Sequence, residues 1–175
     1  MPSVSHRGRA VPPQLSSQEV WRAIGKASFL VISYVTPSGE PRSAGVVYTV
    51  IDRKLYVVTG PDSWKARHIA VDGRTAVTVP VRRGGILSLL APIPPATISF
   101  HATAVVHPPD APPVRPVLEQ LGSLLPKGRR DSVAIIEVTP EDTFTCYGIG
   151  ISLARMRDTD AARARVPVTA EASHG

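Results

Sequence analysis

The chain has only one cysteine, Cys146, among its 175 residues, so it cannot form a disulfide within itself. A lack of disulfides favours a reducing compartment, and we expect a cytoplasmic protein. Cys146 stands in an apolar strand pattern with no histidine near it in the sequence. This context predicts a buried structural thiol rather than a nucleophile. Residues 1–14 also lack the apolar stretch of a signal peptide.

Charged side chains are missing from residues 84–109. Three prolines, Pro92, Pro94 and Pro95, interrupt this segment, so it does not read as a membrane span, and we expect no membrane contact. Its apolar part, the loop 84–95, instead predicts either a dimer contact or an entrance for a hydrophobic substrate, because exposed apolar patches mark such sites.

Side-chain patterns for catalysis or metal binding are missing as well. The sequence shows no paired carboxylates, no Ser-His-Asp arrangement and no metal-ligand spacing, so we predict no catalytic side chain and no metal site. The five histidines are dispersed. His101 and His107 are an even number of residues apart in one strand pattern and therefore face the same side. Haem or metal ligation there is the alternative to simple packing or solvent exposure.

The charge balance is basic, with a net charge of +6. Much of the excess comes from arginines near the two ends of the chain, which favours a cationic surface with basic tails over a nucleic-acid footprint. With 5% aromatic residues, the chain also lacks stacking platforms in basic surroundings, so a nucleic-acid binder ranks third among the function hypotheses. The hydrophobic content of 43% suits a single globular domain with a core.

Hydrophobic periodicity and turn residues divide the chain into arm, domain and tail. We expect a mobile N-terminal arm over residues 1–14, a folded domain over 15–157 and a flexible C-terminal tail over 158–175. Ser16 and Glu19 form a capping-box pattern at the start of a helix. The expected helices are 16–26, 63–71 and 113–125, and the expected strands are 29–35, 43–51, 54–59, 74–81, 96–107, 132–138 and 143–149.

The first three of these strands form an antiparallel meander in this prediction. The whole set predicts a mainly β (α+β) protein with two or three short helices. A closed or nearly closed antiparallel barrel is favoured, because closure removes exposed edges. An open α+β sandwich is the alternative.

Cationic side chains stand at a strand start and at the start of the second helix. Arg42 can offer a bidentate fork to a phosphate, and Lys65 a point charge. Ser63 and the free N–H groups of the helix start add donors. Arg67 is two residues from Lys65, so one of the two faces water or a second subunit. Ordinary surface charge is the alternative for all three cations.

A second group of residues could hold a flat ring. Ser43, Ala44 and Gly45 are small and would let a ring approach the strand closely, with Val58 and Thr59 beside it; barrel packing is the alternative. Trp64 would stack on such a ring or cap the pocket, unless it serves an interface or the core.

The order of these motifs resembles the pyridoxamine 5′-phosphate oxidase-like family of split β-barrels, which bind flavin mononucleotide (FMN) or a deazaflavin coenzyme. The likeness covers roughly residues 28–157. It is carried by Gly39-Glu40-Pro41-Arg42-Ser43, Leu55-Tyr56-Val57-Val58-Thr59, Ser63-Trp64-Lys65-Ala66-Arg67-His68-Ile69 and Asp72-Gly73-Arg74. The chain departs from the family at His68, where asparagine is common, and at Ala102, near which a glycine is common.

The resemblance implies a split antiparallel β-barrel that forms a homodimer with its cofactor at the subunit interface. The implied cofactor is FMN, or alternatively the 8-hydroxy-5-deazaflavin coenzyme, and the implied activity is oxidation or reduction of a small organic substrate. A non-catalytic protein that binds flavin or a hydrophobic ligand is the alternative. The implied cofactor-binding residues are Arg42, Ser43, Ala44, Val58, Thr59, Ser63, Trp64, Lys65 and Arg67.

Overall fold

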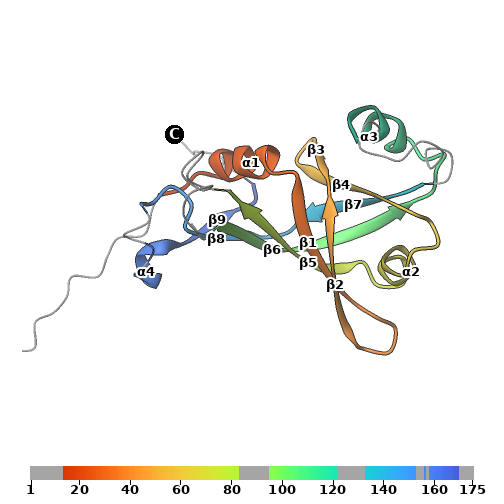
Figure 1. Cartoon of the computed structure of the whole chain (residues 1–175), viewed down its shortest axis with the longest axis horizontal. Coiled ribbons are helices and arrows are strands. Elements are labelled where there is room, and N and C mark those ends of the chain that lie inside the picture. The colour runs from red at the N-terminus through yellow and green to blue at the C-terminus, as the bar shows by residue number, and fades with distance from the viewer. Residues whose placement is uncertain (1–13, 83–94, 122–132, 153–155, 157, 170–175) are drawn as a thin grey trace, which may run out of the picture.

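The computed structural model describes residues 14–82, 95–121, 133–152, 156 and 158–169 (Figure 1). The predictions for the arm over 1–13, for most of the apolar loop 84–95 and for the helix end at 122–125 lie outside these residues. The helices are α1 (Ser17–Lys26), α2 (Trp64–Val71), α3 (Val114–Leu121) and α4 (Thr159–Ala162). The strands are β1 (Phe29–Val35), β2 (Pro41–Val47), β3 (Thr49–Ile51), β4 (Lys54–Thr59), β5 (Arg74–Val81), β6 (Ala96–His107), β7 (Ala134–Pro140), β8 (Thr143–Tyr147) and β9 (Arg163–Pro167).

Helix α1 begins with the predicted capping box. The Ser16 side chain accepts from the N–H of Glu19, and the Glu19 carboxylate accepts from the N–H of Ser16 at 2.9 Å. Val20, Trp21 and Ile24 are buried. The Ser17 hydroxyl and the Trp21 indole N–H both donate to the carbonyl of Val168, so the first helix is tied to the end of the described chain.

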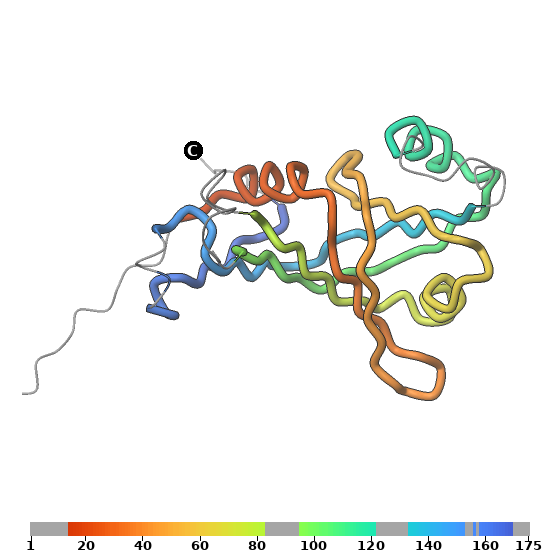
Figure 2. The backbone as a smooth tube through the Cα atoms, viewed as in Figure 1, coloured from red at the N-terminus to blue at the C-terminus, as the bar shows by residue number. Residues whose placement is uncertain are grey.

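Two hairpins open the sheet. The β1–β2 turn has Gly39 at φ 86°, a conformation that favours glycine, and this hairpin projects beyond the neighbouring strands (Figure 2). Asp52 and Arg53, at φ 50° and 59°, form the two-residue turn between β3 and β4. Two successive positive φ values are characteristic of type I′ hairpin turns, whose twist matches that of the strands.

The strands form a single antiparallel sheet in the order β2-β1-β5-β6-β7-β4-β3. The predicted three-stranded meander forms only in part: the predicted strand 43–51 pairs with β1 through β2 and with β4 through β3, but β2 and β3 lie at opposite edges of the sheet, and β4 pairs on its other side with β7. Tyr48 interrupts the predicted strand 43–51 between β2 and β3, and its hydroxyl donates to the carbonyl of Ile24 at 2.5 Å.

The edge strands of that order, β2 and β3, are joined by Tyr48 alone. In a flat sheet, seven strands would place the two edges about 29 Å apart. One residue spans only about 7 Å. The sheet therefore curls until its edges meet, and the predicted α+β split barrel is confirmed.

The barrel splits along β6. One side of β6 pairs with β5 over Ala96–Thr103, whereas the other side pairs with β8 at residues 97–99 and with β7 at residues 102–107. Strands β8 and β7 leave β6 in different directions, and β9 extends the sheet beyond β8 (Figure 1).

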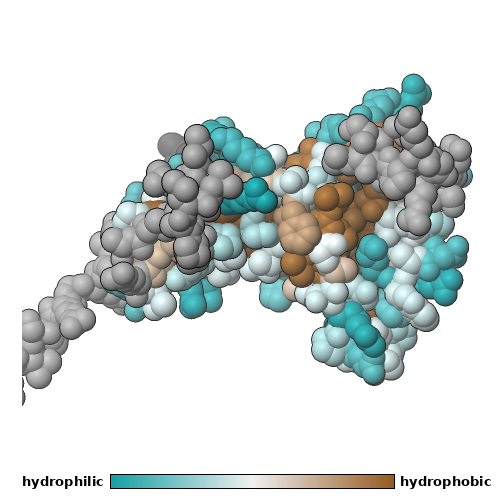
Figure 3. Space-filling view, in the orientation of Figure 1, coloured by the Kyte–Doolittle hydropathy of each residue, from teal (hydrophilic) through white to brown (hydrophobic). Residues whose placement is uncertain are grey.

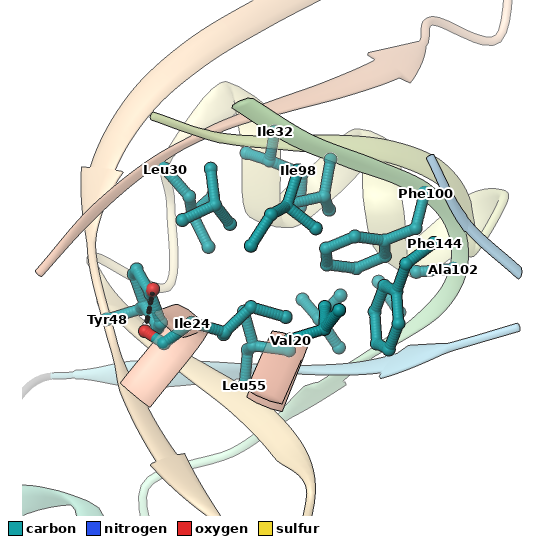
Figure 4. Close-up of a cluster of buried hydrophobic side chains, with 14 of the residues drawn as sticks. Val20, Ile24, Leu30, Ile32, Tyr48, Leu55, Ile98, Phe100, Ala102 and Phe144 are labelled. Atoms are coloured by element: carbon teal, nitrogen blue, oxygen red, sulfur yellow. Dashed lines mark hydrogen bonds between the residues drawn. The ribbon is translucent and has the colours of Figure 1, made fainter. Parts of the chain in front are cut away.

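The barrel interior is filled by apolar side chains from the strands and from α1. In Figure 4, Val20 and Ile24 point from α1 toward Leu30, Ile98 and Phe144 of the strands. Phe144 makes edge-to-face contacts with Trp21 and Phe100, at ring-centroid distances of 5.4 and 5.2 Å. A second, smaller apolar cluster lies outside the barrel wall, where α3 packs on β4 and β7.

The structure differs from the predicted flexible tail over residues 158–175. Residues 159–167 form α4 and β9, and β9 pairs with β8 along its length. Ala164 and Val166 are buried, whereas Arg163 and Arg165 are exposed. The prediction looked for an apolar stripe in an Ala/Arg-rich segment and missed this two-residue strand alternation. In the part of the chain that the structure describes, no helix is long and apolar enough to cross a membrane.

A charged cluster links three strands on the outside of the barrel. The Glu137 carboxylate on β7 accepts from Lys54 Nζ at 2.6 Å, and His107 Nε2 lies 3.1 Å from its other oxygen. The Glu137 side chain is 13% exposed. Burial alone would raise the pKa of Glu137, but the hydrogen bonds and charges of Lys54 and His107 lower it overall.

We predict that Tyr48→Phe lowers the free energy of unfolding by about 1 kcal/mol, because the buried Ile24 carbonyl loses its hydroxyl donor. Urea denaturation measures the change. Tyr147→Phe is the matched control, since its hydroxyl bond to the carbonyl of Met156 is only partly buried. An equal or larger loss in the control would contradict a special role for Tyr48.

We predict that Glu137→Gln destabilises the protein by about 1–3 kcal/mol at neutral pH, because the Lys54 and His107 contacts lose the carboxylate charge. A lowered folded-state pKa stabilises the fold above the unfolded value of 4.5 and loses that effect as the pH falls through the folded value. The difference between wild type and variant should therefore shrink below pH 4.5. Glu119→Gln, which removes an exposed carboxylate on α3, should show no such pH dependence in thermal denaturation.

Candidate functional site

The start of α2 is fixed directly after strand β4. The Ser63 hydroxyl caps the helix by accepting from the N–H of Ala66 at 3.2 Å, and it lies 3.0 Å from the hydroxyl of Thr59. Ala66 and Ile69 are buried, and Ile69 belongs to the barrel core. The opening turn of α2 is therefore held by the barrel on one side and capped by Ser63.

Two amide donors remain open at this turn. Ser63 satisfies the N–H groups of Ala66 and Arg67 through its hydroxyl and its carbonyl. Among the described residues, nothing accepts from the N–H groups of Trp64 and Lys65. Free N–H groups and the positive end of the helix dipole favour an anion at such a position.

The two cations of α2 differ in their surroundings. Lys65 is partly buried and makes no ion pair within the described part of the chain. Arg67 is exposed and lies 3.5 Å from the Asp62 carboxylate, and its guanidinium carbon is 5.8 Å from the centre of the Trp64 ring. Of the two cations, Lys65 is therefore the one without a competing carboxylate.

Arg42 is related to α2 through two aromatic residues. In the β1–β2 register, Arg42 stands opposite Tyr34, and cross-strand partners project to the same face of a sheet. The Tyr34 ring is 5.8 Å from the ring of His68 on α2. Arg42 also pairs with Glu40 at 2.8 Å, but both side chains are about 60% exposed, so the pair is weak. A phosphate can compete for this guanidinium.

Sequence reasoning gave Tyr34 no role at the site and noted His68 only as a departure from the family. The His68 ring lies between those of Tyr34 and Trp64, with centroids 5.8 and 5.7 Å away. Its Nδ1 is the one buried side-chain N or O atom in the described residues without a hydrogen-bond partner. The alternation of inward and outward side chains along β1 was the available signal for Tyr34, because it places this residue on the inward face near the end of the strand.

The barrel wall divides the remaining predicted residues into two groups. Ala44 stands opposite Ile32 and faces the interior, as does the buried Thr59. Ser43 faces outward, and Val58 packs in the outer cluster under α3. Within one chain, the structure does not bring Ser43 and Val58 to the same side of the wall as Ala44 and Thr59.

The small-residue stretch has a packing role at Gly45. A Cβ at this position would lie 2.6 Å from Cζ of Phe29, so the Phe29 ring covers the strand where a flat ligand was expected to approach. Trp64, in contrast, is 71% exposed and has no place in the core.

Within the described residues, no metal ligand set is gathered and the cysteine is not a reactive thiol. Cys146 is buried as predicted, and burial raises its pKa to about 11, so its thiolate is scarcely populated at neutral pH. No group of three or more His, Cys, Asp or Glu side chains converges within the described ranges. What the site offers is a set of donors and cations suited to a phosphate.

No protein-family model matches the chain, and a search of the curated proteins finds no match. Solved structures do match. The heme storage protein HutZ from Vibrio cholerae aligns with a TM-score of 0.59 and 17% identity over 76% of this chain and 95% of its own. An FAD-binding protein from Mesorhizobium loti aligns with a TM-score of 0.59 and 15% identity over 73% of this chain and 91% of its own.

A putative pyridoxamine 5′-phosphate oxidase from Listeria innocua aligns with a TM-score of 0.54 and 13% identity, over 71% of this chain and 93% of its own. Other similar structures are a heme binding protein from Mycobacterium smegmatis and an F420 reductase. At these identities the likeness concerns the fold. The chain therefore has the split β-barrel fold of these proteins, as the resemblance in its sequence implied.

Proposed function

We propose that the chain binds a phosphate-bearing flavin-type cofactor at the opening turn of α2 and oxidises or reduces a small organic substrate with it. The observation that carries the proposal is the pair of open N–H groups, of Trp64 and Lys65, at a helix start where Lys65 itself makes no ion pair with any described residue. The donor set fits a phosphate of charge near −2, which needs fixed hydrogen-bond donors and cations.

The residues around this turn have distinct roles in the proposal. Lys65 supplies a point charge, and Arg42 supplies a guanidinium from β2, the strand paired with β1. Ser63 holds the helix start in place. A bound flavin or deazaflavin supplies the hydride chemistry, so the protein needs no nucleophile of its own. The split-barrel neighbours that bind FAD or act as an F420 reductase support this cofactor class without choosing FMN or deazaflavin.

A non-catalytic carrier of flavin or of a hydrophobic ligand is the second candidate. It is favoured by the heme storage and heme binding proteins among the structures with this fold. Turnover separates the two functions: tight cofactor binding without electron transfer to any acceptor would favour the carrier. We retain the cytoplasm as the proposed compartment, on the strength of the single cysteine.

We also propose a homodimer that uses the outer face of the barrel. Most outward side chains of β1, β2, β5 and the first part of β6 are uncharged: Phe29, Val31, Ser33, Val35, Ser43, Gly45, Val47, Ala76, Thr78, Pro80, Thr97 and Ser99. Arg74 at the start of β5 and His101, opposite Ala76 on β6, face the same side. The cross-strand pair Phe29 and Val47 is 44% and 45% exposed. Figure 3 shows apolar surface gathered over the region of β2 and β3. A largely uncharged sheet face that no described helix covers suits an isologous contact with a second copy.

We predict that Lys65→Ala weakens FMN or deazaflavin binding about tenfold to a hundredfold, because one charge-assisted contact to the phosphate is lost. The protein should purify yellow or bind added flavin, and fluorescence titration measures the affinity. The matched control is Lys26→Ala, which removes an exposed cation from the last turn of α1, a different helix. An unchanged affinity in Lys65→Ala would remove this residue from the site.

We predict that Val47→Glu converts a dimer into a monomer, because the two-fold contact would bury a carboxylate from each copy. Light scattering after size-exclusion chromatography measures the mass. Val71→Glu places the same charge on α2, on a residue as exposed as Trp64 but away from this face, and should leave the dimer intact. A wild-type monomer, or a dimer in Val47→Glu, would overturn the proposed interface.

A further inference from the structure

Trp64 is exposed in a way that packing does not explain. The other tryptophan, Trp21, is buried and donates its indole N–H to Val168, whereas Trp64 is 71% exposed at the first position of α2. A large aromatic side chain held in water at a helix start contributes little buried apolar area to the fold, so its surface is free for a contact with a ligand.

The indole of Trp64 is held in place by its neighbours on the helix. The His68 ring lies 5.7 Å from it, tilted by 44°, and the Arg67 guanidinium carbon lies 5.8 Å from its centre. His68 is in turn in contact with Tyr34 of β1. A ring oriented in this way loses little freedom when a second ring stacks on it, which favours binding.

Trp64 also lies at the phosphate site itself. Its own N–H is one of the two open donors, and the one carboxylate that the Arg67 guanidinium meets among the described residues is the exposed Asp62, at 3.5 Å. A ligand with a phosphate at the helix start would therefore find a flat aromatic surface and a second cation on the solvent side. This matches a planar base joined to the site through a second phosphate.

We propose that Trp64 stacks on the adenine base of a dinucleotide flavin and that Arg67 binds its second phosphate, so the site prefers flavin adenine dinucleotide (FAD) to FMN. The flavin ring does not suit this position, because hydride chemistry needs a ring shielded from water and Trp64 lies at the surface. This inference rests on the proposed flavin-type function and makes Trp64 a specificity-determining residue within it.

The test measures dissociation constants for FAD, FMN and AMP with wild type, Trp64→Ala, Trp64→Phe and Val71→Ala. Because stacking of a base on an aromatic side chain typically changes affinity by about an order of magnitude, Trp64→Ala should weaken FAD about tenfold and FMN less than about twofold. Trp64→Phe keeps a flat ring and should retain most of the FAD affinity. Val71→Ala removes an equally exposed side chain from the other end of α2 and should change neither.

Equal affinities for FAD and FMN in wild type, or equal losses for both in Trp64→Ala, would overturn the inference while leaving the flavin function standing. AMP separates the remaining cases, because it carries the base and a phosphate without the flavin. If AMP binds through Trp64 and no flavin binds, the proposed flavin function fails, but the stacking of Trp64 on an adenine base is supported. If neither AMP nor a flavin binds, both proposals are overturned.

Discussion

The fold depends on the single residue that joins the two edges of the sheet. Strands β2 and β3 stand at opposite ends of the strand order, and only Tyr48 separates them in the chain. Because one residue cannot cross the width of a flat sheet, the strands must curl into a barrel. The Tyr48 hydroxyl then joins this seam to α1 through the carbonyl of Ile24, and α1 fills the interior with Val20 and Ile24.

Closure of the barrel also arranges the candidate site. The curl brings the end of β1 against α2, where Tyr34 meets His68, and this contact relates Arg42 to the open amide groups of Trp64 and Lys65. The same wall separates Ala44 and Thr59 inside from Ser43 and Val58 outside. A ligand bound at the turn of α2 therefore meets the helix start first, with Tyr34 and His68 beside it. Residues on the outer face can join such a site only at a contact with another molecule.

Local signals in the sequence were sufficient for most elements. The capping box of Ser16 and Glu19 forms as predicted, and the turn at Asp52 and Arg53 and the cap at Ser63 likewise depend on neighbours within a few residues. The errors occurred where pairing partners are far apart. Nothing local in residues 43–51 shows that the chain changes partners at Tyr48, and the alternation of residues 163–167 was hidden by an Ala- and Arg-rich composition.

The sequence by itself determined the period, the polarity and the ends of its helices and strands, together with the gathering of cations and a capping serine around one helix start. These properties follow from backbone sterics and from hydrogen bonds between near neighbours. Only the tertiary structure decided that β4 pairs with β7, that Phe29 covers Gly45, and that Trp64 remains exposed beside Arg67. Those outcomes depend on contacts between residues that are far apart in the chain and are brought together only when the barrel closes. A short window of sequence does not contain both partners of such a contact.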